Sequence, residues 1–151
     1  MSLKDDLDEL GADLYRELLI DHYKNPRNAG ALEPNDFHHD GDNPTCGDMV
    51  EVYARVRDGK IQDIRFKGKG CAISQASASI LYDDIKGKPL DDLLHLNVEN
   101  VQELLGITLR PARVKCATLP LVVLKEGIKE YRSRGEAKKP LPGFGRKERS
   151  P

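Results

Sequence analysis

Four side chains of metal-binding type are the residues of this sequence most suited to chemistry: Cys46, Asp48, Cys71 and Cys116. The chain has 151 residues and three cysteines, an odd number whose spacings match no compact disulfide framework. The cysteines are therefore interpreted as free thiols or metal ligands. Three thiolates and one carboxylate suffice for tetrahedral zinc or for an iron-sulfur cluster with one non-cysteine ligand, and sulfur donors argue against calcium or magnesium.

The sequence around these four residues favours their convergence on one site. Gly47 permits a turn that could aim the side chains of Cys46 and Asp48 at one point. Cys71 and Cys116 both precede predicted helices, where the positive end of the helix dipole favours a thiolate over a thiol. From the residues alone, three alternatives stay open: a shared metal site for chemistry, a structural zinc site, and cysteines that serve as small core residues.

Basic side chains flank the second and third cysteines: Lys67, Lys69, Arg113 and Lys115. We expect Lys115 to act electrostatically on the neighbouring Cys116, because a protonated lysine cannot bind a metal ion. The histidines include the adjacent pair His38 and His39, but adjacent loop residues rarely chelate together. A solvated turn is therefore expected at that pair.

The composition is that of a soluble, highly charged globular protein. Hydrophobic residues make up 38% of the chain and charged residues 32%, and the formal net charge is -1. Because Lys+Arg (24) and Asp+Glu (25) nearly cancel, we expect no nucleic-acid binding. The acidic N-terminus lacks the apolar region of a signal peptide and no apolar run is long enough to span a bilayer, so we expect a cytoplasmic protein that does not bind membranes.

The first part of the chain predicts a helix followed by an irregular crossing. Leucines at three- and four-residue steps indicate an amphipathic helix over about Asp6–Tyr23, which ends before Pro26. The stretch Arg27–Pro44 is rich in Asn, Asp, Gly and Pro and has no sustained period. It is expected to be a loop that delivers the chain to Cys46.

A β-hairpin is predicted next. Apolar and polar residues alternate over Val50–Val56, as in a strand with one buried face, and Asp58-Gly59 supplies a turn. The second strand continues through Ile64 and Phe66. Because the apolar phase is broken before these residues, we expect a bulge or a longer turn near Lys60.

Helices are predicted in the second half of the chain, over Ala72–Lys86, from the cap at Asn97 to Leu105, and over about Thr118–Tyr131. Gly87 and Gly106 are expected to end the first two. Pro120 is placed in the first turn of the last helix, where proline is tolerated. The element order indicates an α+β fold with a small antiparallel sheet covered by helices. We expect one domain over residues 1–136 and a mobile, basic, Pro/Gly-rich tail over 137–151.

Several motifs, in this order, resemble those of the IscU/SufU family of iron-sulfur cluster assembly proteins: Leu14–Leu18, Asp21–Asn28, Asn43–Asp48, Gly68–Ser74 and Arg113–Thr118. The resemblance spans roughly residues 12 to 132. It implies an α+β fold with a three-stranded antiparallel sheet. It also implies a site at the rim of the fold formed by Cys46, Asp48, Cys71 and Cys116.

The resemblance further implies an activity and its partners. A cysteine desulfurase would donate sulfur as a persulfide, for which Cys116 and Cys46 are the candidate acceptors. The protein would then assemble a transient [2Fe-2S] cluster for apo iron-sulfur acceptor proteins. The alternative is a zinc-bound sulfur acceptor that activates the desulfurase without holding a cluster. Either role is closer to that of a scaffold or sulfur acceptor than to that of an enzyme with its own turnover.

The sequence differs from both branches of this family. IscU-type proteins carry a histidine where this chain has Lys115, and their chaperone-docking motif is replaced by Arg110–Lys115, so dedicated chaperone docking is not expected. SufU-type proteins usually carry an insertion of about twenty residues between the second and third cysteines, which is missing here. The resemblance therefore implies Asp48 as the fourth ligand. The oligomeric state stays open.

Overall fold

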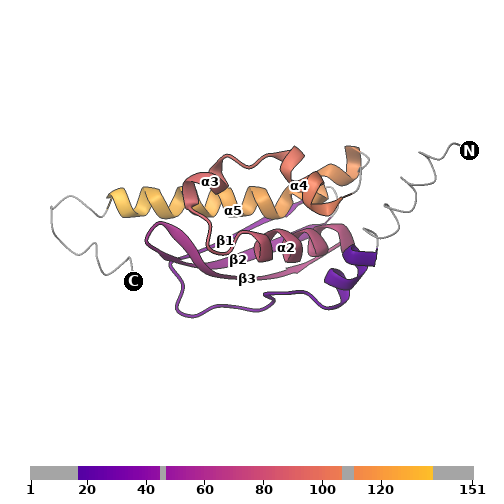
Figure 1. Ribbon diagram of the computed structural model, residues 1–151, viewed down its shortest axis with the longest axis horizontal. Helices are drawn as coiled ribbons and strands as arrows, with labels where there is room; N and C mark the ends of the chain where they lie inside the picture. The colour runs from indigo at the N-terminus through magenta and orange to yellow at the C-terminus, as the bar shows by residue number, and fades with distance from the viewer. Residues whose placement is uncertain (1–16, 45–46, 107–110, 138–151) are drawn as a thin grey trace, which may run out of the picture.

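The computed structural model describes residues 17–44, 47–106 and 111–137. Its elements are β1 (Phe37–Asn43), β2 (Asp48–Arg57), β3 (Lys60–Lys69), α2 (Ala72–Asp84), α3 (Leu90–Leu94), α4 (Val98–Leu105) and α5 (Pro111–Ala137) (Figure 1). Residues 17–24 are also helical, in agreement with the predicted N-terminal helix, whose earlier part lies outside the described residues. The predicted mobile tail also lies outside them, except for Ala137, which ends α5.

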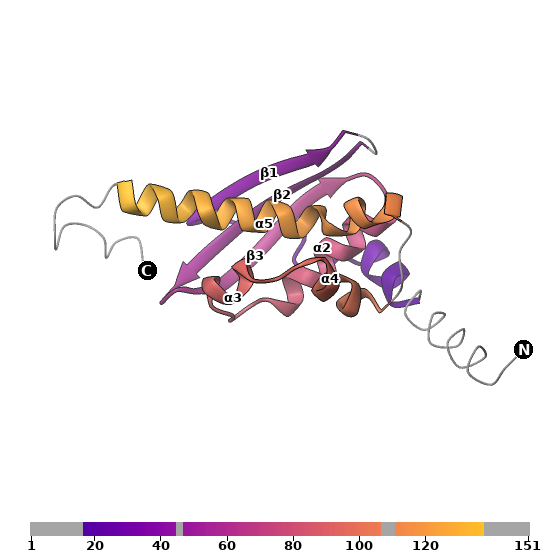
Figure 2. The ribbon, with the colours of Figure 1, turned by 90° about the horizontal axis from the view of Figure 1, so that it is seen from above.

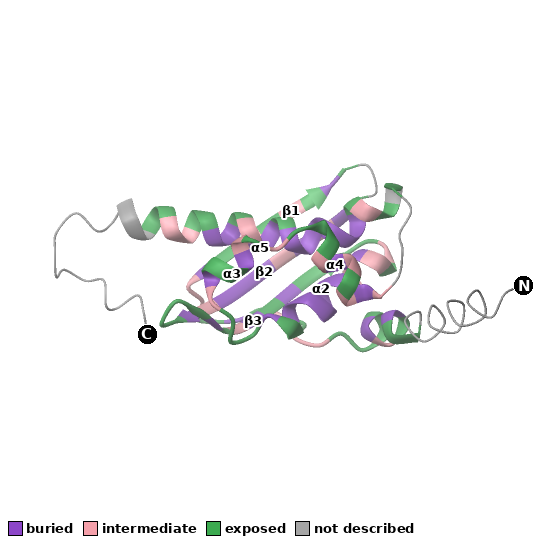
Figure 3. Cartoon of the chain, turned by 45° about the horizontal axis from the view of Figure 1, so that its top comes forward, coloured by how far each residue is buried: buried purple, intermediate pink, exposed green. Residues whose placement is uncertain are grey.

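The strands form an antiparallel sheet in the order β1-β2-β3. In β2, alternate residues such as Val50, Val52 and Ala54 are fully buried, because one face of the sheet is covered by helices. The long helix α5 lies across β1 and β2, and α2 lies over β3 (Figure 2). Figure 3 shows that buried residues recur along α2, α5 and the strands that they cover. The predicted α+β fold is confirmed.

The β2–β3 hairpin confirms the predicted turn and irregularity. Asp58 and Gly59 both have positive φ, which is the requirement of a two-residue type I′ turn. The register then shifts between Arg55 and Val56, so that one residue of β3, Gln62, has no cross-strand partner. This position is close to Lys60, where the apolar phase of the sequence predicted a bulge.

The prediction of a loop over residues 27–44 is wrong for its last part, which forms β1. Only Phe37 is a large apolar residue in this strand. Further along its helix-facing side, Gly41 lies so close to α5 that a Cβ atom would be 2.9 Å from Cγ2 of Val123. The strand is therefore specified by pairing with β2 and by close contact with a helix, and neither leaves a period-two apolar pattern.

The helix α4 agrees with the sequence at both caps, whereas α2 has Ile85 and not the predicted Gly87 as its C-cap. Asn97 caps α4 through a reciprocal pair of hydrogen bonds with Asn100, and Gly106 ends it in the left-handed conformation. The α2 helix ends at Asp84, two residues earlier than predicted. The short helix α3 was not predicted. No helix among the described residues is long and apolar enough to cross a membrane.

The last helix begins seven residues earlier than the sequence predicted, at Pro111. Cys116 therefore lies inside α5 and not before it, and Pro120 lies in the helix interior and not in its first turn. Pro111 is suited to a first helical position, because its missing N-H has no partner there in any residue. The prediction that Pro120 lies in the first turn of the helix is therefore wrong, and Pro111 has that position.

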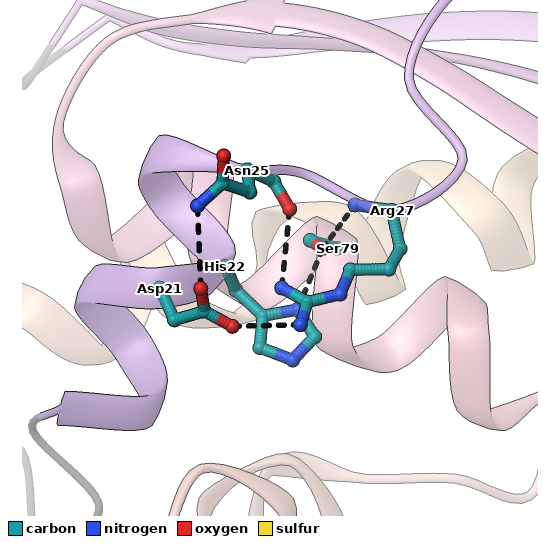
Figure 4. Close-up of polar contacts among 5 residues, drawn as sticks. All are labelled: Asp21, His22, Asn25, Arg27 and Ser79. Atoms are coloured by element: carbon teal, nitrogen blue, oxygen red, sulfur yellow. Dashed lines mark hydrogen bonds and ion pairs between the residues drawn. The ribbon is translucent and has the colours of Figure 1, made fainter.

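The N-terminal helix is attached to α2 by a polar cluster in which His22 and Ser79 are buried (Figure 4). Nδ1 of His22 lies 2.7 Å from Oγ of Ser79, which also accepts a hydrogen bond from the backbone N-H of Arg27 at 2.9 Å. The Arg27 side chain binds the carboxylate of Asp21 at 2.6 Å. Burial lowers the pKa of His22, and the nearby Arg27 lowers it further, against the smaller opposing effects of Asp21 and Asp83.

This cluster predicts a pH dependence of stability. Because the pKa of His22 is lower in the folded state than its usual 6.5, the unfolded chain takes up the proton first as the pH falls. The stability contributed by neutral His22 is complete above pH 6.5 and declines toward the lowered pKa. Urea unfolding between about pH 7.5 and pH 5 should show a smaller loss for His22→Gln than for the unmodified chain. Equal losses in the two proteins would contradict this assignment.

Candidate metal centre

The structure brings together three of the four predicted ligands. The donor atoms of Asp48, Cys71 and Cys116 all lie within 4.8 Å of one another. Asp48 is the first residue of β2, Cys71 is the N-cap of α2 and Cys116 lies in α5. The fourth predicted ligand, Cys46, lies outside the described residues, two positions before Asp48 in the chain. The end of β1, the start of β2, the end of β3 and the start of α5 lie at the same end of the molecule (Figure 2).

The three donors differ in their access to solvent. Asp48 and Cys116 are fully buried, whereas Cys71 is partly exposed. The site is thus closed by the sheet and α5 on one side and reachable from solvent at the start of α2. A ligand or a reacting group that enters from solvent meets Cys71 before the other two donors.

The carboxylate of Asp48 is held against Cys71. Its Oδ1 accepts the backbone N-H of Cys71 at 2.7 Å, and its Oδ2 lies 3.5 Å from the Cys71 Sγ. This carboxylate satisfies one of the N-H groups at the start of α2 and complements the positive end of the helix. A single side chain from the sheet therefore fixes the position of the helix that carries Cys71.

Gly70 makes this close approach sterically feasible. Its φ of +128° is rarely adopted by residues with a side chain. A Cβ atom at this position would overlap the Asp48 carboxylate and would lie 2.7 Å from the Asp48 Cα. Only glycine allows the strand-to-helix junction to pass so close to the buried acid.

Two buried hydroxyl groups connect α2 to α5 close to Pro120. The hydroxyl of Ser77 donates to the carbonyl of Ala117 at 2.6 Å, and the hydroxyl of Tyr82 donates to the carbonyl of Pro120 at 2.7 Å. Pro120 has no N-H to donate to the helical ladder, and the two hydroxyls bind the carbonyl of the residue three positions before it and its own carbonyl. Burial raises the pKa of Tyr82, which keeps its hydroxyl protonated as a donor.

These hydroxyls join the two helices that carry the described cysteines. Cys71 begins the helix that provides the donors, and Cys116 immediately precedes an accepting residue, Ala117. Sequence reasoning missed Ser77 and Tyr82 as site-supporting residues. The feature of the sequence that could have pointed to supporting contacts in this region is Pro120, which lies in the interior of an otherwise apolar helical stretch.

The structure also gives the positions of Lys115 and of the four histidines. Lys115 is exposed and precedes Cys116 in α5. All four histidines are described, and three of them have partners away from the donors: Ser79 for His22, Glu51 for His38 and Glu126 for His39. The pair His38 and His39 lies in β1 and not in the expected turn. No histidine belongs to the donor cluster among the described residues.

The donor chemistry fits a thiophilic metal. Two sulfurs and one carboxylate oxygen suit zinc or iron, and in tetrahedral zinc sites with bonds of about 2.3 Å to sulfur the donors are roughly 3.8 Å apart. The observed limit of 4.8 Å is close to that spacing, so small side-chain movements suffice to bring these donors to one ion. Cys46 would complete a four-ligand set.

Comparisons with known proteins agree with the family resemblance of the sequence. A family model described as the NifU-like N terminal domain matches residues 14–138. The chain is 36% identical over 132 residues to the zinc-dependent sulfurtransferase SufU of Bacillus subtilis, which covers 76% of this chain and 89% of that protein. It is 38% identical over 128 residues to the iron-sulfur cluster assembly scaffold protein IscU of Escherichia coli, which covers 82% of this chain and 98% of that protein.

Solved structures agree with the fold of this chain. A SufU-type protein of Fervidobacterium islandicum AW-1 superposes with a TM-score of 0.67 at 30% identity, covering 74% of this chain and 94% of that one. The N-terminal part of a NifU-like protein from Brucella abortus superposes with a TM-score of 0.69, covering 81% and 96%. At 21% identity, the second match supports the fold alone.

Substitution of Gly70 should disrupt the site selectively. Gly70→Ala forces the Asp48 carboxylate away from Cys71, so zinc affinity should fall about tenfold to a hundredfold in competition with a chromophoric chelator. Gly59→Ala is the matched control, since Gly59 also has positive φ but has open space around its Cα. Both variants strain the backbone, and only the first should weaken zinc binding. Equal zinc affinities of the two variants would contradict the conclusion that a side chain at position 70 displaces the Asp48 carboxylate.

The α2–α5 connection gives a separate prediction. Tyr82→Phe and Ser77→Ala each remove one buried hydroxyl, which should weaken cobalt(II) binding and change the cobalt–thiolate absorption as Cys116 shifts relative to Cys71. Ser79→Ala also removes a buried hydroxyl of α2, but one that binds His22 and not α5. This control should lose stability in urea without changing the cobalt spectrum. Identical spectra in all three variants would show that the hydroxyls do not position the cysteines.

Proposed function

Because the chain belongs to the family of NifU-like N-terminal domains, we propose that it is a scaffold of iron-sulfur cluster assembly. It accepts sulfur from a cysteine desulfurase and transiently binds a [2Fe-2S] cluster on Cys46, Asp48, Cys71 and Cys116. The observation that carries this proposal is the convergence of Asp48, Cys71 and Cys116 from three separate elements on one rim site. The similarity to an IscU scaffold over most of the chain supports it.

The donor set suits a cluster that must later leave. A carboxylate is a weaker ligand for iron than a thiolate, and Asp48 has an alternative partner in the backbone N-H of Cys71. When the cluster leaves, the carboxylate returns to that hydrogen bond, which offsets part of the lost coordination. The partly exposed Cys71 gives an acceptor protein access to the cluster.

Sulfur acceptance needs one thiolate of the site. That thiolate attacks the terminal sulfur of the desulfurase persulfide, a new S–S bond forms, and the desulfurase cysteine leaves as a thiolate. Electrons balance without an added oxidant or reductant. Cys116 and Cys46 remain the proposed acceptors, and because Cys116 is buried, the site must open at α5 before Cys116 can react. Lys115 is exposed next to it, where its charge favours the approach of an anionic persulfide.

A zinc-bound sulfur acceptor is the second candidate, and the compact donor cluster favours it. Donors that all lie within 4.8 Å of one another match a single tetrahedral ion, and a zinc-dependent SufU is 36% identical to this chain. Zinc would be held by the same four residues, and it supplies stabilisation of thiolates at neutral pH. One cysteine would leave the zinc when sulfur arrives.

The proposed setting of this function is the cytoplasm. Its partners are the desulfurase and apo iron-sulfur proteins, without a dedicated chaperone, since Arg110–Lys115 replaces the chaperone-docking motif of IscU-type proteins. A purely structural zinc is the least favoured role. The described fold has a continuous core of buried side chains from the sheet, α2 and α5, so chelation of metal should leave it folded.

Anaerobic reconstitution distinguishes the two candidates. The metal-free chain is incubated anaerobically with ferrous iron, cysteine, a cysteine desulfurase and a thiol reductant, which supplies the electrons that reduce persulfide sulfur to the sulfide of the cluster. Cluster formation is followed by visible absorbance and by transfer to an apo-ferredoxin. The scaffold proposal expects both signals, with loss of both in Cys71→Ser. Persulfide on a zinc-loaded protein that never forms a cluster would support the sulfur acceptor and contradict the scaffold. Circular dichroism of the metal-free chain, which should stay folded, serves as the control.

A further inference from the structure

A groove of about 660 Å³ lies beside the metal centre, between the end of the N-terminal helix and the last part of β3. One wall contains Tyr23 and Pro26, and the other is the edge of the sheet. The residues that line it are Tyr23, Pro26, Ala29, Gly30, Phe66, Lys67, Gly68, Lys69, Gly70 and Gln75. None of the proposed metal ligands is among them.

The groove exposes the backbone edge of β3. Phe66 donates its N-H to the carbonyl of Asn28 at 2.9 Å and accepts the N-H of Gly30 at 2.8 Å, so the chain before β1 pairs with this edge for one residue. Alternate residues of a strand direct their hydrogen-bonding groups to the same side. Gly68 therefore directs its N-H and C=O into the groove, beyond the point where the pairing with Asn28 and Gly30 ends.

The charge along this edge is positive. Lys67 and Lys69 are exposed, and no acidic residue is among the described residues that line the groove. The cross-strand neighbour of Lys67 is Glu51, whose carboxylate is bound to His38 at 2.6 Å. An open strand edge with lysines at alternate positions resists pairing with neutral or basic strands and favours an acidic one.

The groove is continuous with the metal centre. Gly70 and Gln75, which line it, lie on either side of Cys71 in the sequence, and the backbone N-H of Gln75 binds the Cys71 carbonyl. A segment bound along β3 would reach the partly exposed side of Cys71 with its next residues.

We propose that this groove binds an extended acidic segment of a partner protein, which adds to the sheet as a fourth strand beside β3. Its backbone pairs with Gly68, and its acidic side chains contact Lys67 and Lys69. Main-chain pairing supplies affinity in such complexes and side-chain contacts supply specificity. The segment brings its protein to Cys71. This docking goes beyond the cluster chemistry, because it requires neither metal nor sulfur.

Fluorescence anisotropy on the metal-free full chain tests the proposal. The probe is a fluorescein-labelled peptide Glu-Val-Glu-Val-Glu, and the comparison is the same peptide with lysine in place of glutamate. The acidic peptide should bind and the basic one should not. The double variant Lys67→Glu/Lys69→Glu should weaken binding about fivefold or more, whereas Lys60→Glu, at the other end of β3, should have no effect. Equal weakening by both variants, or equal binding of both peptides, would overturn the proposal.

Two further readouts separate strand pairing from general charge attraction. An acidic peptide with alternate N-methyl groups keeps its charge but cannot pair with the sheet edge, and it should not bind. Amide hydrogen exchange of Gly68 should slow when the unmethylated peptide is present. Binding of the methylated peptide with unchanged exchange would contradict the docking mode. Self-association that is lost in the lysine variants and is not inhibited by peptide would show a contact between copies instead.

Discussion

The buried carboxylate of Asp48 is the constraint on which the rest of the site depends. A carboxylate without exposure to solvent needs strong partners, and it obtains them from the backbone N-H and the thiol of Cys71. Cys71 can reach the Asp48 carboxylate only if the residue before it, at the junction between β3 and α2, has no side chain. This explains the glycine at position 70. The sheet, the helix start and one cysteine are thereby fixed as a unit.

A second constraint places the other described cysteine. The α5 helix crosses the sheet as one long element and carries a proline in its interior, at the level of the site. The hydroxyl of Ser77 binds the carbonyl of Ala117, three residues before that proline, and the hydroxyl of Tyr82 binds the carbonyl of the proline itself. As a result, α2 and α5 are joined through polar contacts close to the reactive groups and through apolar packing elsewhere. Cys116 remains buried, while Cys71 stays partly open to solvent.

The sequence allowed prediction of the parts of the fold that depend on local chemistry. The hairpin turn, the cap at Asn97 and the stop at Gly106 follow from residue types with strong conformational preferences. By contrast, β1 and the start of α5 depend on tertiary contacts, which leave no period in the sequence. The site was predicted as a set of donors, but the hydrogen bond from Cys71 to Asp48 and the roles of Ser77 and Tyr82 required the arrangement of elements in space.

X-ray absorption at the zinc edge tests the central claim most directly, because it reports the atoms bound to the metal in the intact chain. For the protein loaded with one equivalent of zinc, the account predicts three sulfurs at about 2.3 Å and one oxygen at about 2.0 Å, with no imidazole scattering. In Asp48→Asn the oxygen contribution should weaken while the three sulfurs remain. An imidazole ligand, or fewer than three sulfurs in the unmodified chain, would contradict a site made of three cysteines and one aspartate.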